Sequence, residues 1–225
     1  MDSVDKNYSF IKDERAIVKK IESLVELSQC EARKIYELYD EDLYFLSIID
    51  KSLKLIDSFL FALKYRNITV LAIFTRVQID CALRAYAVSL VNNSGEFCNK
   101  VLIKKAQINK EKDRNNNYLT DKFLCESLGN YLKLPIYDLY KKVCGYVHFS
   151  SDSFYNSVKT VGENGLEMCI SKDNLDRDPD VYDRLSIELA NHFFYFGKLL
   201  STLFLKSWNM QKEAMANKEK ITDSN

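Results

Sequence analysis

The sequence predicts an all-α protein: a single bundle of about six or seven helices with one small β-hairpin inserted near 157–170. Only six glycines and two prolines occur in 225 residues, so the turns that punctuate sheet proteins are scarce. Hydrophobic residues make up 47% of the chain and recur at helical spacing, which is enough for one core. We therefore expect one helical domain over 1–216 and a disordered tail over 217–225.

The first half of the chain shows three stretches of helical periodicity. Residues 10–27 alternate apolar and charged positions with a helical period, and a longer pattern over 31–64 has an expected break near Asp40–Glu41–Asp42. Residues 68–91 are apolar on nearly every face, so we expect this helix inside the bundle. The polar run Asn92-Asn93-Ser94-Gly95 ends it.

Shorter helices follow in the middle of the chain. Residues 99–117 predict a short helix and then a mobile loop that ends in Asn115-Asn116-Asn117. Another short helix is expected after Thr120. Pro135 suits the first turn of a helix that runs to about His148, because its missing N–H costs nothing there.

The last part of the chain changes period. Asn164-Gly165 is the pair that a tight hairpin turn requires, since both residues must reach positive φ, and the flanking stretches read as strands. Asp178-Pro179 then supplies an N-cap and a first-turn proline. The final helix is expected to reach about Met215.

Composition excludes several classes of partner and cofactor. Basic and acidic residues number 32 each, so no overall field attracts nucleic acid or an acidic membrane. The six cysteines include no C-x-x-C pair and Met1–Ser9 has no apolar signal segment, which together favour free thiols in a reducing cytoplasm. Charges interrupt the apolar runs, so we expect no membrane span, and no metal or cofactor site is predicted.

Three charges on the central helix are the most informative feature. Arg76, Asp80 and Arg84 follow one another at intervals of four and therefore project from one side of an otherwise apolar segment. Burying charges without partners is expensive. The stripe is therefore either an ion-pair ladder that reaches the surface or the floor of a polar site, and we expect Asp80 and Arg84 to be paired.

His148 is the candidate acid/base residue. On a regular helix Lys141, Cys144 and His148 share one face. The exposed carbonyls of a helix C-terminus favour the charged form of a histidine, which is a sufficient structural reason for its position. Two alternatives use Cys144 together with His148. In one they form a nucleophile pair, for which the nearby sequence offers no oxyanion hole. In the other they bind zinc with Cys169, although no two of these ligands have the close spacing typical of a zinc site.

The helix before His148 ends in Y-K-K-V-C-G-Y-V-H-F-S (140–150). Together with the charged stripe, this pattern resembles, from about Leu43 to Leu205, the diverged HEPN-like proteins of bacteria, many of them tied to phage defence or toxin–antitoxin systems. Active members carry an arginine, four to six residues and then a histidine, and they cleave RNA without metal at a site shared by two protomers. Here Lys141 or Lys142 stands in place of that arginine, and lysine cannot make the bidentate phosphate contact.

The resemblance and the side-chain chemistry together give each candidate site residue a role. His148 is the expected acid/base residue, and Lys141 is expected to neutralise developing charge. Arg76 and Arg84 would hold phosphate, an inference from guanidinium chemistry and not from the family motif. Asp80 would orient an arginine.

The expected function is that of a defence-associated, HEPN-like protein that binds RNA as a homodimer and, in the cutting case, cleaves it with His148 as the acid/base residue. The basic segment Lys100–Arg114 is the expected RNA contact, and an operon-encoded protein is the expected further partner. The alternative is a non-catalytic helical module that dimerises or holds a partner. In that case the stripe is a structural ion-pair network.

Overall fold

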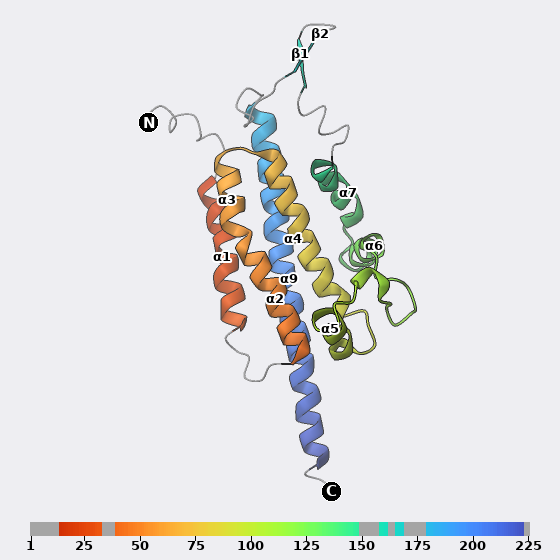
Figure 1. The fold of residues 1–225 in the computed structure, drawn as a ribbon. Coiled ribbons are helices and arrows are strands. Elements are labelled where there is room, and N and C mark those ends of the chain that lie inside the picture. Colours follow the sequence, from red (N-terminus) through yellow and green to blue (C-terminus); the bar gives the residue numbers. More distant parts are fainter. Residues whose placement is uncertain (1–13, 33–38, 149–157, 162–164, 169–178, 223–225) are drawn as a thin grey trace.

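Helices make up most of the chain in the computed structural model, which describes residues 14–32, 39–148, 158–161, 165–168 and 179–222. Figure 1 shows these helices gathered around α4. Their bounds are α1 Glu14–Ala32, α2 Asp40–Lys54, α3 Ile56–Lys64, α4 Ile68–Val88, α5 Ser94–Leu102, α6 Asp121–Leu132, α7 Ile136–Val147 and α9 Pro179–Thr222, with a short 3-10 turn at Ile108–Lys110. The prediction of a mostly helical fold is confirmed for the described residues.

Helix α4 lies at the centre, packed against α9, against α2 and α3, and against α6 and α7 (Figure 1). Asn67 starts the helix, because its side chain accepts a hydrogen bond from the backbone N–H of Val70 and satisfies a first-turn donor. From Cys81 to Val88 every residue except Arg84 is buried. The interior position expected for this helix is confirmed.

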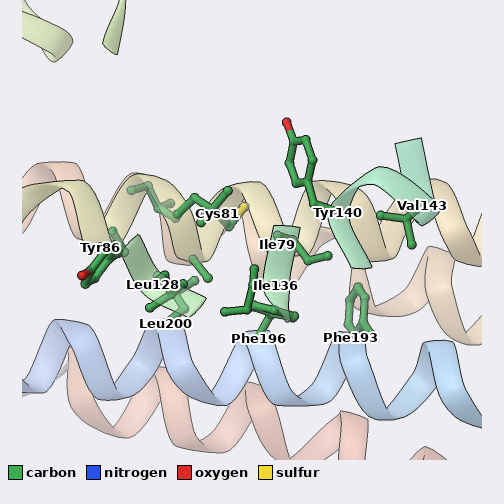
Figure 2. Close-up of a cluster of buried hydrophobic side chains, with 14 of the residues drawn as sticks. Ile79, Cys81, Tyr86, Leu128, Ile136, Tyr140, Val143, Phe193, Phe196 and Leu200 are labelled. Carbon is green, nitrogen blue, oxygen red and sulfur yellow. The ribbon is translucent and has the colours of Figure 1, made fainter. Parts of the chain in front are cut away.

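Aromatic and aliphatic side chains fill the space around α4. Phe59 of α3 stacks on Phe193 of α9 with ring centroids 4.1 Å apart, and both side chains are fully buried. Ile79 of α4 belongs to the same buried core as Phe193, together with residues of α6, α7 and α9 (Figure 2). Tyr140 packs its ring beside this cluster while its hydroxyl points away from it (Figure 2). Tyr140 thus joins the apolar core to a polar region outside it.

The helical pattern over 31–64, expected to break near Asp40–Glu41–Asp42, has a further break at Leu55. The acidic run predicted as a break is the first turn of α2, where negative charge is favoured by the helix dipole. A single residue, Leu55, separates α2 from α3. Its N–H bonds to the carbonyl of Ser52, three residues back, a tighter turn than the α-helix makes. This tight turn separates the axes of α2 and α3, and Ile56 and Phe59 of α3 are buried.

Helix α9 runs alongside α4 and continues past the rest of the bundle at its C-terminal end (Figure 1). It ends at Thr222, beyond the end expected near Met215, so most of the segment expected as a disordered tail (217–225) belongs to the helix. The sequence K-E-A-M-A-N-K-E-K in this part is rich in strong helix formers. Among the described helices, α9 included, none has the sustained apolar stretch needed to cross a bilayer.

Two short strands lie inside the segment expected to form a hairpin. Strand β1 (Val158–Val161) pairs antiparallel with β2 (Gly165–Met168), with Val158 opposite Met168 and Val161 opposite Gly165. Asn164, half of the expected turn, and the flanking residues 149–157 and 169–178 lie outside the described residues. A complete hairpin inserted near 157–170 therefore stays a prediction.

Candidate functional site

The charged stripe of α4 forms ion pairs along the helix. Asp80 lies between the two arginines, with its Oδ2 2.8 Å from Arg76 Nη1 and its Oδ1 3.4 Å from Arg84 Nη2. The expected pair between Asp80 and Arg84 is present. The shorter contact of Asp80, however, is with Arg76.

Asp121, the first residue of α6, completes the set of charges. Its Oδ1 is 2.6 Å from Arg84 Nη2, and its Oδ2 is 3.8 Å from Arg76 Nη2. The N-cap Thr120, whose side chain accepts a hydrogen bond from the N–H of Phe123, starts α6 and so places Asp121 at its first turn. Two arginines and two aspartates therefore meet at the junction of α4 and α6, and their formal charges cancel.

Helix α7 adds a phenol and a thiol to these four charges. The Tyr140 hydroxyl donates to Asp121 Oδ2 over 2.7 Å and accepts a hydrogen bond from Arg76 Nη2. The Arg76 guanidinium also lies over the Tyr140 ring, 3.8 Å from its centroid. Arg76 Nε donates to Cys144 Sγ over 3.0 Å. We call the six side chains of this cluster the stripe network: Arg76, Asp80, Arg84, Asp121, Tyr140 and Cys144.

The network keeps its charged groups charged and its phenol neutral. Burial opposes the ionised form of Asp121, but the hydrogen bond from Tyr140 and the charge of Arg84 outweigh it and lower the pKa of the Asp121 carboxyl. Burial also opposes the charge on Arg76 and Arg84, yet their partners, Asp80 above all, leave both guanidinium pKa values raised. Burial and the bond to Asp121 raise the pKa of Tyr140. None of these four groups is poised to exchange a proton near neutral pH.

Lys141 and His148, two of the predicted site residues, lie outside the stripe network. Lys141 Nζ is 3.0 Å from Asp138 Oδ1, and the Lys141 side chain is 57% exposed. His148 is the residue that follows α7, with extended backbone and an exposed side chain. The contacts of Arg76 on α7 are made by Tyr140 and by Cys144, which lie about two turns and one turn before His148. The structure thus gathers the α4 stripe but does not add Lys141 to it.

The basic segment expected to contact RNA is partly engaged by the protein itself. Lys100 Nζ is 2.9 Å from Glu96 and 3.9 Å from Glu111. Arg114 donates to the backbone carbonyl of Leu90, near the end of α4, where cationic side chains commonly satisfy unpaired carbonyls. The lysines of the segment whose side chains are exposed are Lys104, Lys105, Lys110 and Lys112.

The loop expected to be mobile is organised by a carboxylate. Asp113 is 9% exposed, and its Oδ1 accepts hydrogen bonds from the backbone N–H groups of Asn115 and Asn117 over 2.9 and 2.7 Å. The Asn117 side chain donates to its Oδ2 over 3.2 Å. These bonds lower the pKa of Asp113 against the opposing effect of burial. The asparagine run thus forms a hydrogen-bonded turn around Asp113, and the mobility expected of this loop stays a prediction.

Sequence reasoning missed Asp121 and treated Tyr140 only as a packing residue. Asp121 follows a threonine N-cap, a position where an acidic residue is sufficiently explained by the helix dipole. Tyr140 precedes Lys141 in a helix rich in tyrosine, and nothing in its local pattern distinguishes it. Only the docking of α6 and α7 on α4 gives both residues a partner in the stripe.

One nitrogen of the stripe network is not satisfied within it. Arg84 Nη1 is buried and has no hydrogen-bond partner among the described residues. Arg84 also lines a cavity of about 390 Å³ with Thr120 and Asp121, and His148 is not among the residues that line this cavity. An arginine nitrogen without an acceptor beside a cavity is a feature that a phosphate or carbonyl oxygen would suit.

The two alternatives that use Cys144 gain no support. Its sulfur accepts the hydrogen bond from Arg76. Cys169, the third residue of the zinc hypothesis, lies outside the described residues. Within the part of the chain that the structure describes, no three histidine, cysteine or acidic side chains are grouped so that they could hold a metal ion.

Comparison of the chain with family models, with curated proteins and with solved structures finds no match. The resemblance to HEPN-like proteins therefore stays an expectation from the sequence pattern. Function has to be argued from the geometry of the residues themselves.

Proposed function

We propose that this protein is a non-catalytic helical module that dimerises or holds a protein partner, and that its charged stripe is a structural ion-pair network. The observation that carries the proposal is that the stripe network contains its own counter-charges. Asp80 and Asp121 balance Arg76 and Arg84, so the arginines have no net charge left over to attract a phosphate.

The contacts of Lys141, a predicted catalytic residue, and of Tyr140 support the same proposal. Lys141 is paired with Asp138 on an exposed face of α7, so it is not directed at the arginines. Tyr140 has a raised pKa and serves the network as a neutral donor. A network of this kind joins α4, α6 and α7 in one arrangement, and thereby keeps the outer surfaces of those helices in fixed positions for binding.

The test is expression in bacteria, alone and with the neighbouring genes, followed by measurement of growth and of total RNA integrity. The proposal expects normal growth, intact RNA and no effect of His148→Ala. It also expects the purified chain to self-associate or to bind a neighbour's product in sedimentation experiments. Arg76→Ala should weaken that association because it loosens α7, whereas Lys64→Ala, on the exposed face of α3 and outside those three helices, is the matched control.

A second candidate is the HEPN-like reading, a defence-associated protein that binds and cuts RNA. The unsatisfied Arg84 Nη1 beside its cavity favours it, since a guanidinium with an unused donor can hold phosphate. In that case the wild type degrades RNA, chelators do not stop it, and His148→Ala abolishes the activity while its thermal unfolding is unchanged. RNA binding should also weaken steeply with salt through the exposed lysines of the basic segment. Such a result would replace the first proposal.

A further inference from the structure

An apolar groove crosses α9 between α1 and the start of α7, away from the stripe network. Its volume is about 680 Å³, within the range of about 300–1,000 Å³ that small-molecule sites occupy. Helix α9 contributes one face to it, because Asn191, Tyr195, Lys198 and Thr202 recur at helical spacing and all four are exposed.

The walls of the groove are mostly hydrocarbon. Leu139 and Ile136 of α7 form one side, and Phe194 and Leu199 of α9 form the other. Leu134, at the entrance to α7, is 43% exposed. A wall of this composition in contact with water favours an apolar ligand that would cover it.

Positive charge surrounds the apolar walls. Lys20 of α1 and Lys198 of α9 both line the groove, and no carboxylate is among the described residues that line it. The Lys20 ammonium is 3.1 Å from Asn191 Oδ1 and lies over the Phe194 ring, 4.7 Å from its centroid, so two residues of α9 hold it in the groove. The acid next along α9, Glu188, is already neutralised by Lys142 at 2.8 Å. The groove therefore pairs an apolar interior with cationic edges.

We infer that this groove binds a small anionic amphiphile, a molecule with one hydrocarbon chain and one carboxylate, the chemistry of a fatty acid. The chain lies against the leucine and phenylalanine walls, and the carboxylate meets Lys198 and Lys20. The inference does not rest on the proposed function, because none of these residues belongs to the stripe network.

Calorimetric titration of the purified full chain with sodium dodecanoate, below its micelle concentration, tests the inference. Saturable binding is expected. Replacing dodecanoate by decanoate or octanoate, whose hydrocarbon chains are shorter, should weaken the affinity by about fourfold for each buried methylene removed. Dodecyltrimethylammonium, with the same chain and the opposite charge, should bind at least about tenfold more weakly.

Two variants locate the binding. Lys198→Glu should weaken dodecanoate about tenfold, while the matched control Lys64→Glu, on the exposed face of α3, changes the net charge equally and should leave binding unchanged. Thr202→Trp places an indole at the exposed edge of the groove and should prevent the hydrocarbon chain of dodecanoate from entering it.

Absence of binding, equal affinity for the cationic amphiphile, or no effect of Lys198→Glu and Thr202→Trp would overturn the inference. Concentration-dependent dimerisation that Thr202→Trp abolishes, without dodecanoate binding, would assign the groove to a second copy of the chain and would also overturn it.

Discussion

Replacing Asp121 with alanine tests whether the stripe network stabilises the fold. The change removes the acceptor of Arg84 at 2.6 Å and of the buried Tyr140 hydroxyl at 2.7 Å. Because the Asp121 side chain is 38% exposed, we value its ion pair at no more than about 1 kcal/mol, as for surface pairs. The buried phenol that loses its acceptor adds about 1–2 kcal/mol. We therefore expect Asp121→Ala to lower the free energy of unfolding by about 2–3 kcal/mol.

Urea denaturation followed by circular dichroism measures this loss, and Asp138→Ala is its control. Asp138 is also an acidic first-turn residue in an ion pair, but its side chain is 74% exposed. Asp138→Ala should therefore lower the free energy of unfolding by no more than about 0.5 kcal/mol. The double variant Asp121→Ala/Arg84→Leu should lose less free energy of unfolding than the sum of the two single losses, because it also removes the guanidinium that Asp121→Ala deprives of its closer carboxylate. A stabilising network would be refuted if Asp121→Ala and Asp138→Ala lowered the free energy of unfolding equally and if the effects of Asp121→Ala and Arg84→Leu were additive in the double variant.

Two further variants probe the core by the same measurement. Phe193→Ala removes the ring that stacks on Phe59 of α3 and should lower the free energy of unfolding by about 3–5 kcal/mol. Phe61→Ala, at a ring that is 63% exposed, should lower it by about 0.5 kcal/mol or less, and similar losses for the two variants would contradict the assigned core. Gly197→Ala should destabilise by about 1–2 kcal/mol although alanine is the better helix former, because the new Cβ would lie 2.6 Å from Leu24 Cδ1 and 2.9 Å from Gln78 Nε2. A higher melting temperature for Gly197→Ala would show that α1 and α9 are less closely packed than this.

Where the helices begin is largely readable from the sequence. Asn67 and Thr120 cap α4 and α6 through bonds to N–H groups three residues ahead, and Pro135 immediately precedes α7. Such interactions depend on neighbours within one turn, so local residue type predicts them. The same is true of the stripe, since a spacing of four places Arg76, Asp80 and Arg84 on one side of any helix.

The sequence was less informative about breaks and about ordered loops. The tight turn at Leu55 carries neither glycine nor proline, so the periodicity over 31–64 predicts no second break there. The turn around Asp113 uses asparagines that also fit a flexible loop. At Leu55 the chain turns so that Ile56 and Phe59 are buried, which the local pattern does not encode, and around Asp113 the same asparagines suit a flexible loop and a hydrogen-bonded turn equally well.

By itself the sequence determined a helical bundle, an interior central helix and a line of charges on it, because periodicity and charge spacing are local properties. Only the tertiary structure decided which residues of other helices those charges contact. Asp121 lies 37 residues after Arg84, and Tyr140 lies 64 residues after Arg76. Both reach the stripe through the packing of α6 and α7 on α4. On the sequence alone the stripe is either an ion-pair ladder or the floor of a polar site. In the fold, Asp121 of α6 joins Asp80 in neutralising the two arginines, because the distant partners of a charge are decided by which surfaces pack together.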